Sequence, residues 1–598
     1  PVYNEDGSWN RKFIRKANDR NPKLSAEYDY KHEKMLRAFN TLYAEYEIIK
    51  NLKFKTTFSY DYTTVKGEKW YDPRTSNGED ENGEVVKRIR EYKKMVWSNT
   101  LSYLTTFNNI HHLDFLAGYE IDDTYNDYLS GEAYNFTTPD KHAISNGMKT
   151  VSVGGSDSRY RLVSYLSRLN YDYKNKYYLG ASFRVDGSSR LHRDNRWGTF
   201  WSVSGAWRTI EEEFMQPVKD WLTDLRIRAS YGVNGTLPSD YFGYMGLSSI
   251  SGGYLEQPGI QMSQIANPNL KWETNYNMNI GLDFGFWDRL NFTIEYYTRT
   301  TKNLLMDCPV SMTTGFSSYL MNIGEVKNKG IELTINSTNI KIKDFSWNTT
   351  FNLGHNSNKV VKLDGEQTQI VSGTQIHKVG SSYRTFYVQE FAGINPETGN
   401  PLFYTNELDE NGNYIKEITE NSKNAQFIPY KHAEPTVNGG ISNSLRYKWL
   451  DLNFLFSYQF GGYSYDTWAQ KTEHGGYDSY ANIPTYYRDS WKKPGDQTNI
   501  EVYMPGKSSS VSMHKITSSR RIHSTDYFRL KNITFGITLP KEWTNKINIG
   551  NVRFYASASN LWTWAAYDNY DPEAVSAGSA TQTTPPLKTV TFGFNINF

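Results

Sequence analysis

The chain has 598 residues, of which 38% are hydrophobic and 22% are charged, and its mean hydropathy is −0.68. It contains no run approaching the roughly 18 consecutive apolar residues of a transmembrane helix, so a helical membrane protein is excluded. Lys and Arg together number 66 and Asp and Glu 64, so the formal charge of +2 gives no overall field that would recruit nucleic acid.

Aromatic residues make up 15% of the chain, which is too many for a disordered protein. The composition leaves open a large β-rich soluble protein or a transmembrane β-barrel, whose strands alternate apolar and polar residues and are hydrophilic on average. Cys308 is the only cysteine, which excludes an intramolecular disulfide and a cysteine-based zinc site.

The chain opens with the turn-like segment PVYNEDGSWN. This segment has neither the basic region nor the apolar core of a signal peptide. We therefore expect Pro1 to be an interior point of a longer chain.

Apolar and polar residues alternate with period two along most of the chain, and this pattern predicts about 17 β-strands. The last segment is the clearest, with Phe592, Phe594 and Ile596 on one side and Thr591 and Asn595 on the other. In chain order the predicted strands span 35–49, 52–64, 90–106, 111–128, 159–173, 176–187, 197–209, 222–232, 270–286, 289–304, 319–339, 344–356, 434–446, 449–463, 525–540, 548–562 and 587–598.

The connections between these strands alternate between short turns, such as Asn108–Asn109, and long loops, such as 357–433. Short turns at one end and long loops at the other are typical of a bacterial outer-membrane barrel. A soluble sandwich or propeller has no reason to separate its loops by length in this way. If the last strand ends in the periplasm, an odd number of strands places Pro1 outside the cell. Because single-chain bacterial barrels have even strand numbers, we also expect further strands, about five, to precede Pro1.

Seven stretches, in order, resemble the SusC/RagA family of TonB-dependent outer-membrane transporters of Bacteroidetes. They are SRLNYDYKNKYYLGASFRVDGSSR (167–190), LKWETNYNMNIGLDFGF (270–286), NIGEVKNKGIELTINS (322–337), FAGINPETGNPLFY (391–404), YRDSWKKPGD (487–496), DYFRLKNITFGITLP (526–540) and the ending SASNLWTWAAYDNYDPE…PPLKTVTFGFNINF. The resemblance covers essentially the whole chain.

The resemblance implies an all-β fold, a transmembrane antiparallel barrel of about 22 strands, plugged by an N-terminal domain and preceded by a segment that binds TonB. It also implies a SusD-like surface lipoprotein as a lid on the outer mouth. By this resemblance we expect residues 1–598 to form part of a barrel. We expect the signal peptide, the TonB-binding segment, the plug and the first strands to lie outside this sequence. The plug residues that would contact substrate therefore have no counterparts to assign.

The last strand resembles the signal that the barrel-assembly machinery reads. Alternating apolar residues with a final aromatic let an edge strand pair with another sheet while its side chains dock into pockets. These residues are equally compatible with a plain lipid-facing strand. The predicted signal comprises Phe592, Phe594, Ile596 and Phe598.

Charged residues on the polar side of the strands are predicted to face the lumen, because an Arg at the lipid midplane costs roughly 2–4 kcal/mol. Most of them are expected to line water or to bond to the plug, and Arg184 and Asp186 are interpreted first as a structural pair. The predicted lumen-facing set comprises Arg184, Asp186, Arg226, Arg228, Arg529 and Arg553.

The long loops are predicted to contact substrate or lid, since binding residues concentrate on loops held by a rigid scaffold. Rings interleaved with Asp, Asn and Gln suit sugars, but they also suit peptides, an interface with a lid, or packing within the loop itself. The candidates are Tyr463, Tyr465, Trp468, His474, Tyr477, Tyr480, Tyr486, Tyr487 and Trp491, with weaker clusters that include Tyr134, Tyr241 and Tyr244.

Metal, cofactor and catalytic signals are poor. The runs 77–84 and 406–413 faintly resemble calcium loops, but turn formation explains them better. His111 and His112 point to opposite faces of a strand and cannot share a metal ion. No hydrolytic motif stands out.

We therefore expect a TonB-dependent importer for a glycan or an oligopeptide, not an enzyme, with a SusD-like lid, TonB, the assembly machinery and the lipid bilayer as partners. The alternatives are a passive porin-type channel, which would have no plug or TonB segment, and a soluble carbohydrate-binding or adhesion protein. A barrel enzyme would need a hydrolytic group of residues at its mouth.

Overall fold

The computed structural model describes residues 2–11, 21–254, 257–363, 368–476, 483–506, 513, 516–547, 549–581 and 583–597. Its main feature is one sheet of 17 strands. Each strand pairs antiparallel with the next barrel strand along the chain, so the sheet is a continuous meander. The predicted barrel architecture and its strand count are confirmed.

The barrel strands are β1 (Tyr30–Ile49), β2 (Leu52–Tyr71), β3 (Glu84–Phe107), β4 (His111–Phe136), β5 (Gly147–Tyr173), β6 (Tyr177–Ser188), β7 (Trp197–Trp207), β8 (Leu222–Thr236), β11 (Glu273–Phe286), β12 (Leu290–Lys302), β15 (Glu325–Ile342), β16 (Phe345–Lys362), β26 (Val437–Tyr447), β27 (Leu450–Phe460), β30 (Tyr527–Thr538), β31 (Asn551–Ala565) and β33 (Thr589–Asn597).

Several strands extend beyond their predicted bounds toward the long loops. β4 continues to Phe136 and β5 begins at Gly147, whereas the pattern predicted an end near 128 and a start near 159. The added part of β5 is rich in Gly and Ser and has no apolar alternation, yet it pairs with β4 through the backbone. The alternation of apolar and polar residues therefore predicts only the part of each strand that has an apolar side. Backbone hydrogen bonding extends the strands beyond that part.

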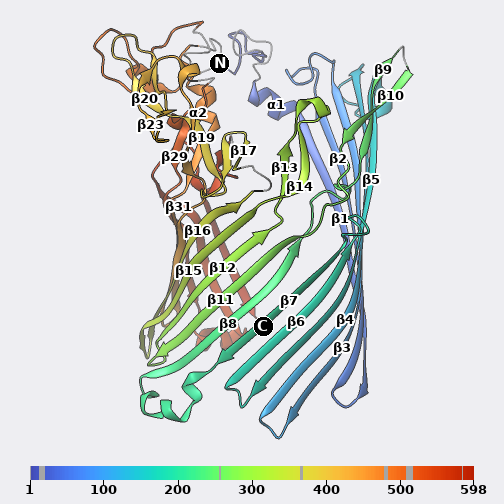
Figure 1. The fold of residues 1–598 in the computed structure, drawn as a ribbon, viewed down its shortest axis with the longest axis vertical. Helices are drawn as coiled ribbons and strands as arrows, with labels where there is room; N and C mark the ends of the chain where they lie inside the picture. The colour runs from blue at the N-terminus through green and yellow to red at the C-terminus, as the bar shows by residue number, and fades with distance from the viewer. Residues whose placement is uncertain are drawn as a thin grey trace.

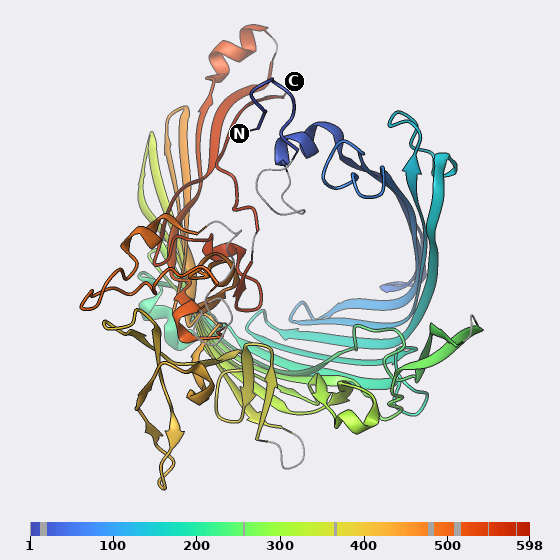
Figure 2. The ribbon, with the colours of Figure 1, turned by 90° about the horizontal axis from the view of Figure 1, so that it is seen from above.

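The sheet curves around a central space, and its strands are steeply tilted (Figures 1 and 2). β1 pairs with β2, and β33 pairs with β31. The curved wall is open between these two strands in the part of the chain that the structure describes (Figure 2).

Tight turns connect the strands at one end of the wall, which we call the short-turn end. Asn108 and Asn109 have φ angles of 52° and 57°, and Lys174 and Asn175 have 56° and 53°. Two successive left-handed residues match the right-handed twist of the flanking strands. Two short-turn connections carry helical segments, namely η2 (Thr209–Glu211) with η3 (Glu213–Val218), and α3 (Lys541–Thr544) with η8 (Asn545–Ile547).

The opposite end, which we call the long-loop end, carries the remaining elements (Figure 1). They are α1 (Pro22–Tyr28), η1 (Ile144–Asn146), β9 (Leu247–Tyr254), β10 (Gln257–Gln264), β13 (Leu305–Pro309), η4 (Met312–Thr314), β14 (Ser318–Asn322), β17 (Gln369–Ser372), β18 (Gln375–Lys378), β19 (Thr385–Gln389), β20 (Phe391–Ile394), β21 (Pro401–Tyr404), β22 (Glu407–Leu408), β23 (Tyr414–Ile415), β24 (Ile418–Thr419), η5 (Ser422–Asn424), β25 (Phe427–His432), β28 (Tyr463–Asp466), α2 (Thr467–Thr472), η6 (Thr485–Asp489), η7 (Ser519–Arg521), β29 (Ile522–Ser524), η9 (Pro572–Ala574) and β32 (Ser579–Ala580).

The sheet has an apolar face and a polar face, because directly paired residues share a side. Ile280, Tyr296 and Ile331 are cross-strand neighbours on the apolar face, and each is exposed. Buried apolar clusters instead lie among the loops, as with Phe386, Val388, Tyr465 and Ile522. Such a sheet has its apolar side outside and its polar side toward the central space, which is the organisation of a membrane barrel. Across the described residues, every helix is too short or too polar to traverse a bilayer.

Candidate functional site

Three long loops join into one body at the long-loop end. β28 belongs to the loop between β27 and β30, and it pairs with β29 of the same loop and with β32 of the loop between β31 and β33. The loop between β16 and β26 is attached to this small sheet, since the Gln375 side chain donates to the Ala577 carbonyl at 2.7 Å. Segments far apart in the sequence therefore form one connected surface above the barrel wall.

Asp466 is the polar centre of this loop body and is fully buried. Its Oδ1 accepts from the backbone N–H groups of Trp468 and Ala469, which caps α2. Its Oδ2 accepts from the Tyr567 hydroxyl and the Asn569 amide, each at 2.9 Å. Four donors occupy the carboxylate, so its role is to hold the two loops together.

The ring of Tyr567 lies flat on the ring of His523, with the centroids 3.7 Å apart and the planes 2° from parallel. Burial lowers the pKa of His523 to about 4, because the imidazolium would lose its hydration. Burial also raises the pKa of Tyr567, and the neighbouring Asp466 carboxylate adds to this. Both rings are thus neutral near pH 7.

Arg529 ties the last long loop to the top of β30 and is 1% exposed. Its guanidinium donates to Thr563 Oγ1 at 2.9 Å and to Asp571 at 2.6 Å, and it also contacts Glu573. Lys531 reaches Glu573 at 2.7 Å. The predicted lumen residue Arg529 is therefore engaged by carboxylates of the loop that folds onto the polar face.

A cavity of about 890 Å³ lies between α2, the top of β31 and the loop that follows β31. The structural residues Asp466, Arg529 and Asp571 line it. Exposed residues also line it, namely Trp468, Thr563, Trp564, Asp568, Asn569, Thr581, Thr583, Thr584 and Pro585. Its volume is within the range of about 300–1,000 Å³ found for small-molecule sites.

The aromatic residues predicted at 463–491 do not form one exposed surface. Tyr465, His474 and Tyr487 are buried in the loop body, and Tyr463 is half-buried. Trp468 and Tyr486 are each 39% exposed, and the Tyr486 hydroxyl contacts Glu473. Tyr477 and Tyr480 lie outside the described residues.

Trp491 holds two loops against each other. Its indole N–H donates to the Pro396 carbonyl at 2.7 Å, and its ring lies where a Cβ on Gly399 would come within 2.6 Å. Gly399 has φ 71°, a conformation that suits glycine. This geometry gives Trp491 a role in packing the loops. Packing is one of the three roles that the sequence allows for these residues, beside contact with substrate and contact with a lid.

The weaker predicted clusters lie elsewhere at the long-loop end. Tyr241 packs its ring on Tyr160, with the centroids 4.8 Å apart, and accepts from the Asn126 amide. Tyr244 packs against the buried cluster that contains Leu270. The Tyr134 hydroxyl donates to Glu132. The structure does not bring these three residues together with the loop body.

The remaining predicted lumen residues form ion pairs on the polar face. Arg184 binds Asp186 of its own strand at 2.7 Å, and Arg553 binds Asp451 of another strand at 2.6 Å. Arg226 and Arg228 share Asp283, and Arg228 also contacts Glu295. The charges of the wall are therefore largely compensated in place.

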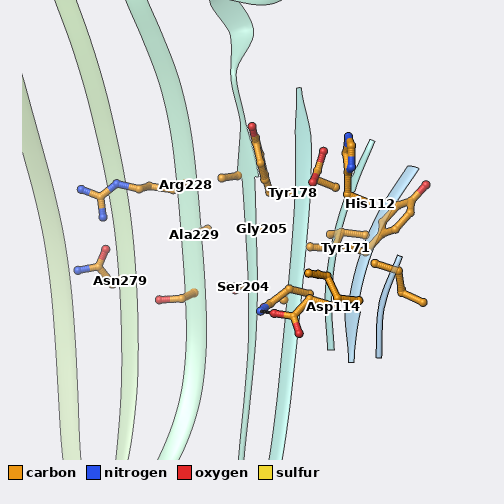
Figure 3. A pocket seen from close by; sticks show the side chains of 17 residues that line it. His112, Asp114, Tyr171, Tyr178, Ser204, Gly205, Arg228, Ala229 and Asn279 are labelled. Carbon is orange, nitrogen blue, oxygen red and sulfur yellow. Dashed lines mark hydrogen bonds between the residues drawn. The ribbon is translucent and has the colours of Figure 1, made fainter. Parts of the chain in front are cut away.

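A second pocket, of about 510 Å³, lies in the barrel wall near the short-turn end. Figure 3 shows His112, Asp114 and Tyr178 on one side and Arg228 and Asn279 on the other, with small residues such as Ser204, Gly205 and Ala229 between them. The small side chains create the depression, and polar side chains stand on both of its sides. No group of three or more His, Cys, Asp or Glu residues in the described ranges is placed to hold a metal ion. Asp409 caps its own turn through the N–H groups of Asn411 and Asn413, as the turn interpretation of 406–413 predicted.

Sequence reasoning places Asp466 in the aromatic-rich loop at 463–491 but does not identify its partners. The loop-body residues that it misses are His523, Tyr567, Asn569, Asp571 and Glu573. The stretch YDNYDPE at 567–573 contains four of them. Its density of acidic and aromatic residues is the signal that could have identified it.

The chain resembles known proteins in both sequence and structure. The family model described as "TonB dependent receptor-like, beta-barrel" matches residues 2–408. TonB-dependent receptor P3 of Formosa agariphila is 31% identical over 100% of this chain and 61% of its own length. TonB-dependent receptor SusC of Bacteroides thetaiotaomicron is 29% identical over 86% of this chain and 51% of its own length. A solved structure of the RagAB peptide transporter superposes with a TM-score of 0.89 at 25% identity, covering 100% of this chain and 66% of that chain. The chain thus spans about three fifths of the first listed curated relatives that it matches.

Proposed function

The chain belongs to the TonB-dependent receptor family of outer-membrane β-barrels, of the SusC and RagA type, and from this premise we propose that it is the barrel portion of an importer for a large nutrient. The barrel lies in the outer membrane, with short turns toward the periplasm and long loops toward the outside. The proposed cargo is a glycan or an oligopeptide. Residues 1–598 are proposed to act as one barrel unit.

In the proposed mechanism the cargo binds between the barrel mouth and a SusD-like lipoprotein lid. TonB, acting on the N-terminal part that the family implies, then opens a path through the lumen. The barrel contributes a hydrogen-bonded wall whose backbone groups are satisfied within the sheet, as lipid requires. The family is one of receptors and transporters, and the proposal includes no chemical change of the cargo.

The observation that carries this proposal is the loop body above the polar wall. Asp466 and Arg529 each bond to the loop that follows β31, and the loop body borders the open 890 Å³ cavity at the mouth. Within the wall below, ion pairs such as Arg228 with Asp283 compensate the charges and leave a polar surface. A hydrogen-bonded site at the entrance and a polar wall behind it suit capture followed by passage.

The last strand fits the proposed role in assembly. Phe592 and Phe594 of β33 are strongly exposed on the apolar face, and Ile596 lies on the same side. Phe598 lies outside the described residues. We propose that the assembly machinery reads this strand.

Co-purification tests the proposal. The full-length transporter is isolated from native outer membranes under mild detergent, and bound proteins and small molecules are identified by mass spectrometry. The proposal expects a surface lipoprotein in stoichiometric amount together with a glycan or a peptide. A transporter that emerges alone and forms a permanently open pore in planar bilayers would contradict it.

A further inference from the structure

The cavity at the mouth has a lining that separates one class of cargo from others. Its charged residues differ in whether their bonding capacity is already used within the protein. Groups that are fully bonded internally shape the cavity, whereas free groups can meet a ligand. The groups that are not bonded within the protein therefore determine which ligands the cavity can bind.

Among the described residues that line the cavity, Arg529 is the only cation, and its donors are already used within the protein. Thr563, Asp571 and Glu573 accept from its three nitrogens. A buried guanidinium that holds two carboxylates gains little from a third anion, which would displace one of them into a buried and unpaired position. The cavity therefore offers no site for a sulfated or uronic-acid sugar.

Two of the carboxylates in the lining are occupied as well. Asp466 accepts from four donors, and Asp571 binds Arg529 and the backbone N–H of Glu573. Asp568 differs, because it is exposed and no hydrogen bond to its carboxylate is seen among the described residues. It supplies one acceptor pair that is available to a ligand.

The remaining available surface is neutral. Trp468 is the second residue of α2, is 39% exposed and lines the cavity. Thr581, Thr583 and Thr584 line the cavity from the loop that follows β32, and all three are exposed. Trp564, Asn569 and Pro585 are also exposed in the lining and add further uncharged surface. An exposed indole, several hydroxyls and one carboxylate match a pyranose ring, whose C–H face stacks on an aromatic ring and whose adjacent hydroxyls donate to a carboxylate.

We propose that this cavity binds an uncharged oligosaccharide, with Trp468 as the stacking platform and Asp568 as the acceptor for a pair of hydroxyls. The inference rests on the proposed import function and names the cargo class for its entrance site. A volume of about 890 Å³ is near the upper end of small-molecule sites, so the ligand is an oligomer. A basic peptide is the competing ligand, since Asp568 and Trp468 would also attract a cation.

Binding to the purified full-length transporter with its natural partner tests this assignment. Titration calorimetry in detergent uses three sets of probes: uncharged oligosaccharides (glucan, mannan, xylan, galactan and fructan fragments), oligogalacturonates of matched length, and lysine-containing heptapeptides. We expect at least one uncharged oligosaccharide to bind, and the other two sets to fail to compete with it. Trp468→Ala should weaken binding roughly tenfold, whereas Trp468→Phe should retain most of it.

Asp568→Asn should weaken binding several-fold, because an amide offers one acceptor atom in place of two. Trp562→Ala is the matched control, since Trp562 lies on the apolar face of β31 opposite Leu530. Heat-modifiable migration in gel electrophoresis verifies that each variant forms a folded barrel. Trp468→Ala without effect, or binding of the uronate or peptide set in place of uncharged sugars, would overturn the assignment.

The outcome separates this inference from the proposed function. Uptake that requires TonB but carries only peptides or acidic sugars would leave the import function standing and overturn the cargo class. Binding of an uncharged sugar without any energised uptake would do the reverse.

Discussion

The Tyr567 hydroxyl donates a 2.9 Å hydrogen bond to the buried carboxylate of Asp466 and thereby joins two loops that are about a hundred residues apart. Tyr567→Phe removes this bond and keeps the ring on His523. The buried carboxylate then lacks one donor, which costs about 1–3 kcal/mol of local stability. Hydrogen exchange of residues 463–472 and 566–571 should accelerate by the corresponding factor.

Tyr430→Phe is the control for this change, because Tyr430 is exposed on β25 at the same end of the molecule. Exchange in both segments should be unaltered in the control. Equal exchange rates in Tyr567→Phe and in the unmodified protein would show that the Asp466 bond does not hold the loops.

Acid should loosen the same loop body through His523. Its pKa is about 4 in the folded loops and about 6.5 when it is exposed, so the opened state binds more protons between these values. Stability of the closed loops is therefore complete above pH 6.5 and falls as the pH drops toward 4. The charged groups that face the ring are Asp466, Arg520 and Arg521.

Hydrogen exchange of residues 522–524, corrected for intrinsic rates, measures this dependence. His523→Phe retains a flat ring on Tyr567 and cannot be protonated, so its profile should be flatter between pH 6.5 and pH 4. Identical pH profiles for the two proteins would assign any acid effect to other groups.

Trp491 should matter for loop packing and not for barrel formation. Trp491→Phe loses the hydrogen bond to Pro396, worth about 1 kcal/mol, and Trp491→Ala loses the ring as well and should cost more. Limited proteolysis should cut the loops containing residues 391–404 and 491–502 fastest in Trp491→Ala, more slowly in Trp491→Phe and most slowly in the unmodified protein. Heat-modifiable migration of the barrel should stay normal in both variants, and its loss would contradict the assignment.

A positive charge introduced at one of two neighbouring positions of β11 should reduce barrel folding, whereas the same charge at the other position should be tolerated. Ile280 lies on the apolar face, and Asn279 lies on the polar face beside Arg228 and Ser230. Ile280→Arg would place a cation toward lipid at a cost of roughly 2–4 kcal/mol, whereas Asn279→Arg faces the lumen and should be tolerated. The amount of folded barrel in outer membranes measures this difference, and equal yields would reject the assignment of the two faces.

The barrel strands can be predicted from the sequence because each one contains its own alternation of apolar and polar residues. Ile280, Leu282 and Phe284 alternate with polar neighbours, and this local pattern needs no knowledge of partner strands. The pattern weakens where a strand has no apolar side, so the sequence alone predicts a loop where β5 begins at Gly147. Strand pairing there depends on backbone groups, which every sequence shares.

The loop body could be predicted only in part, because its contacts join distant segments. An aromatic-rich loop at 463–491 was recognisable, but nothing in it distinguishes Tyr465, which is buried, from Trp468, which is exposed. The partners Tyr567 and Asn569 come from another loop. Their role follows from the pairing of β28 with β32, which no local pattern encodes.

Energy-dependent uptake tests the central proposal most directly. Cells that express the full-length transporter, with or without functional TonB, are given fluorescently labelled uncharged oligosaccharides, and accumulation in the periplasm is measured over time. The proposal predicts accumulation against a gradient that disappears when TonB is inactivated. Equal accumulation in both strains, reaching only the external concentration, would contradict it and would indicate a passive channel.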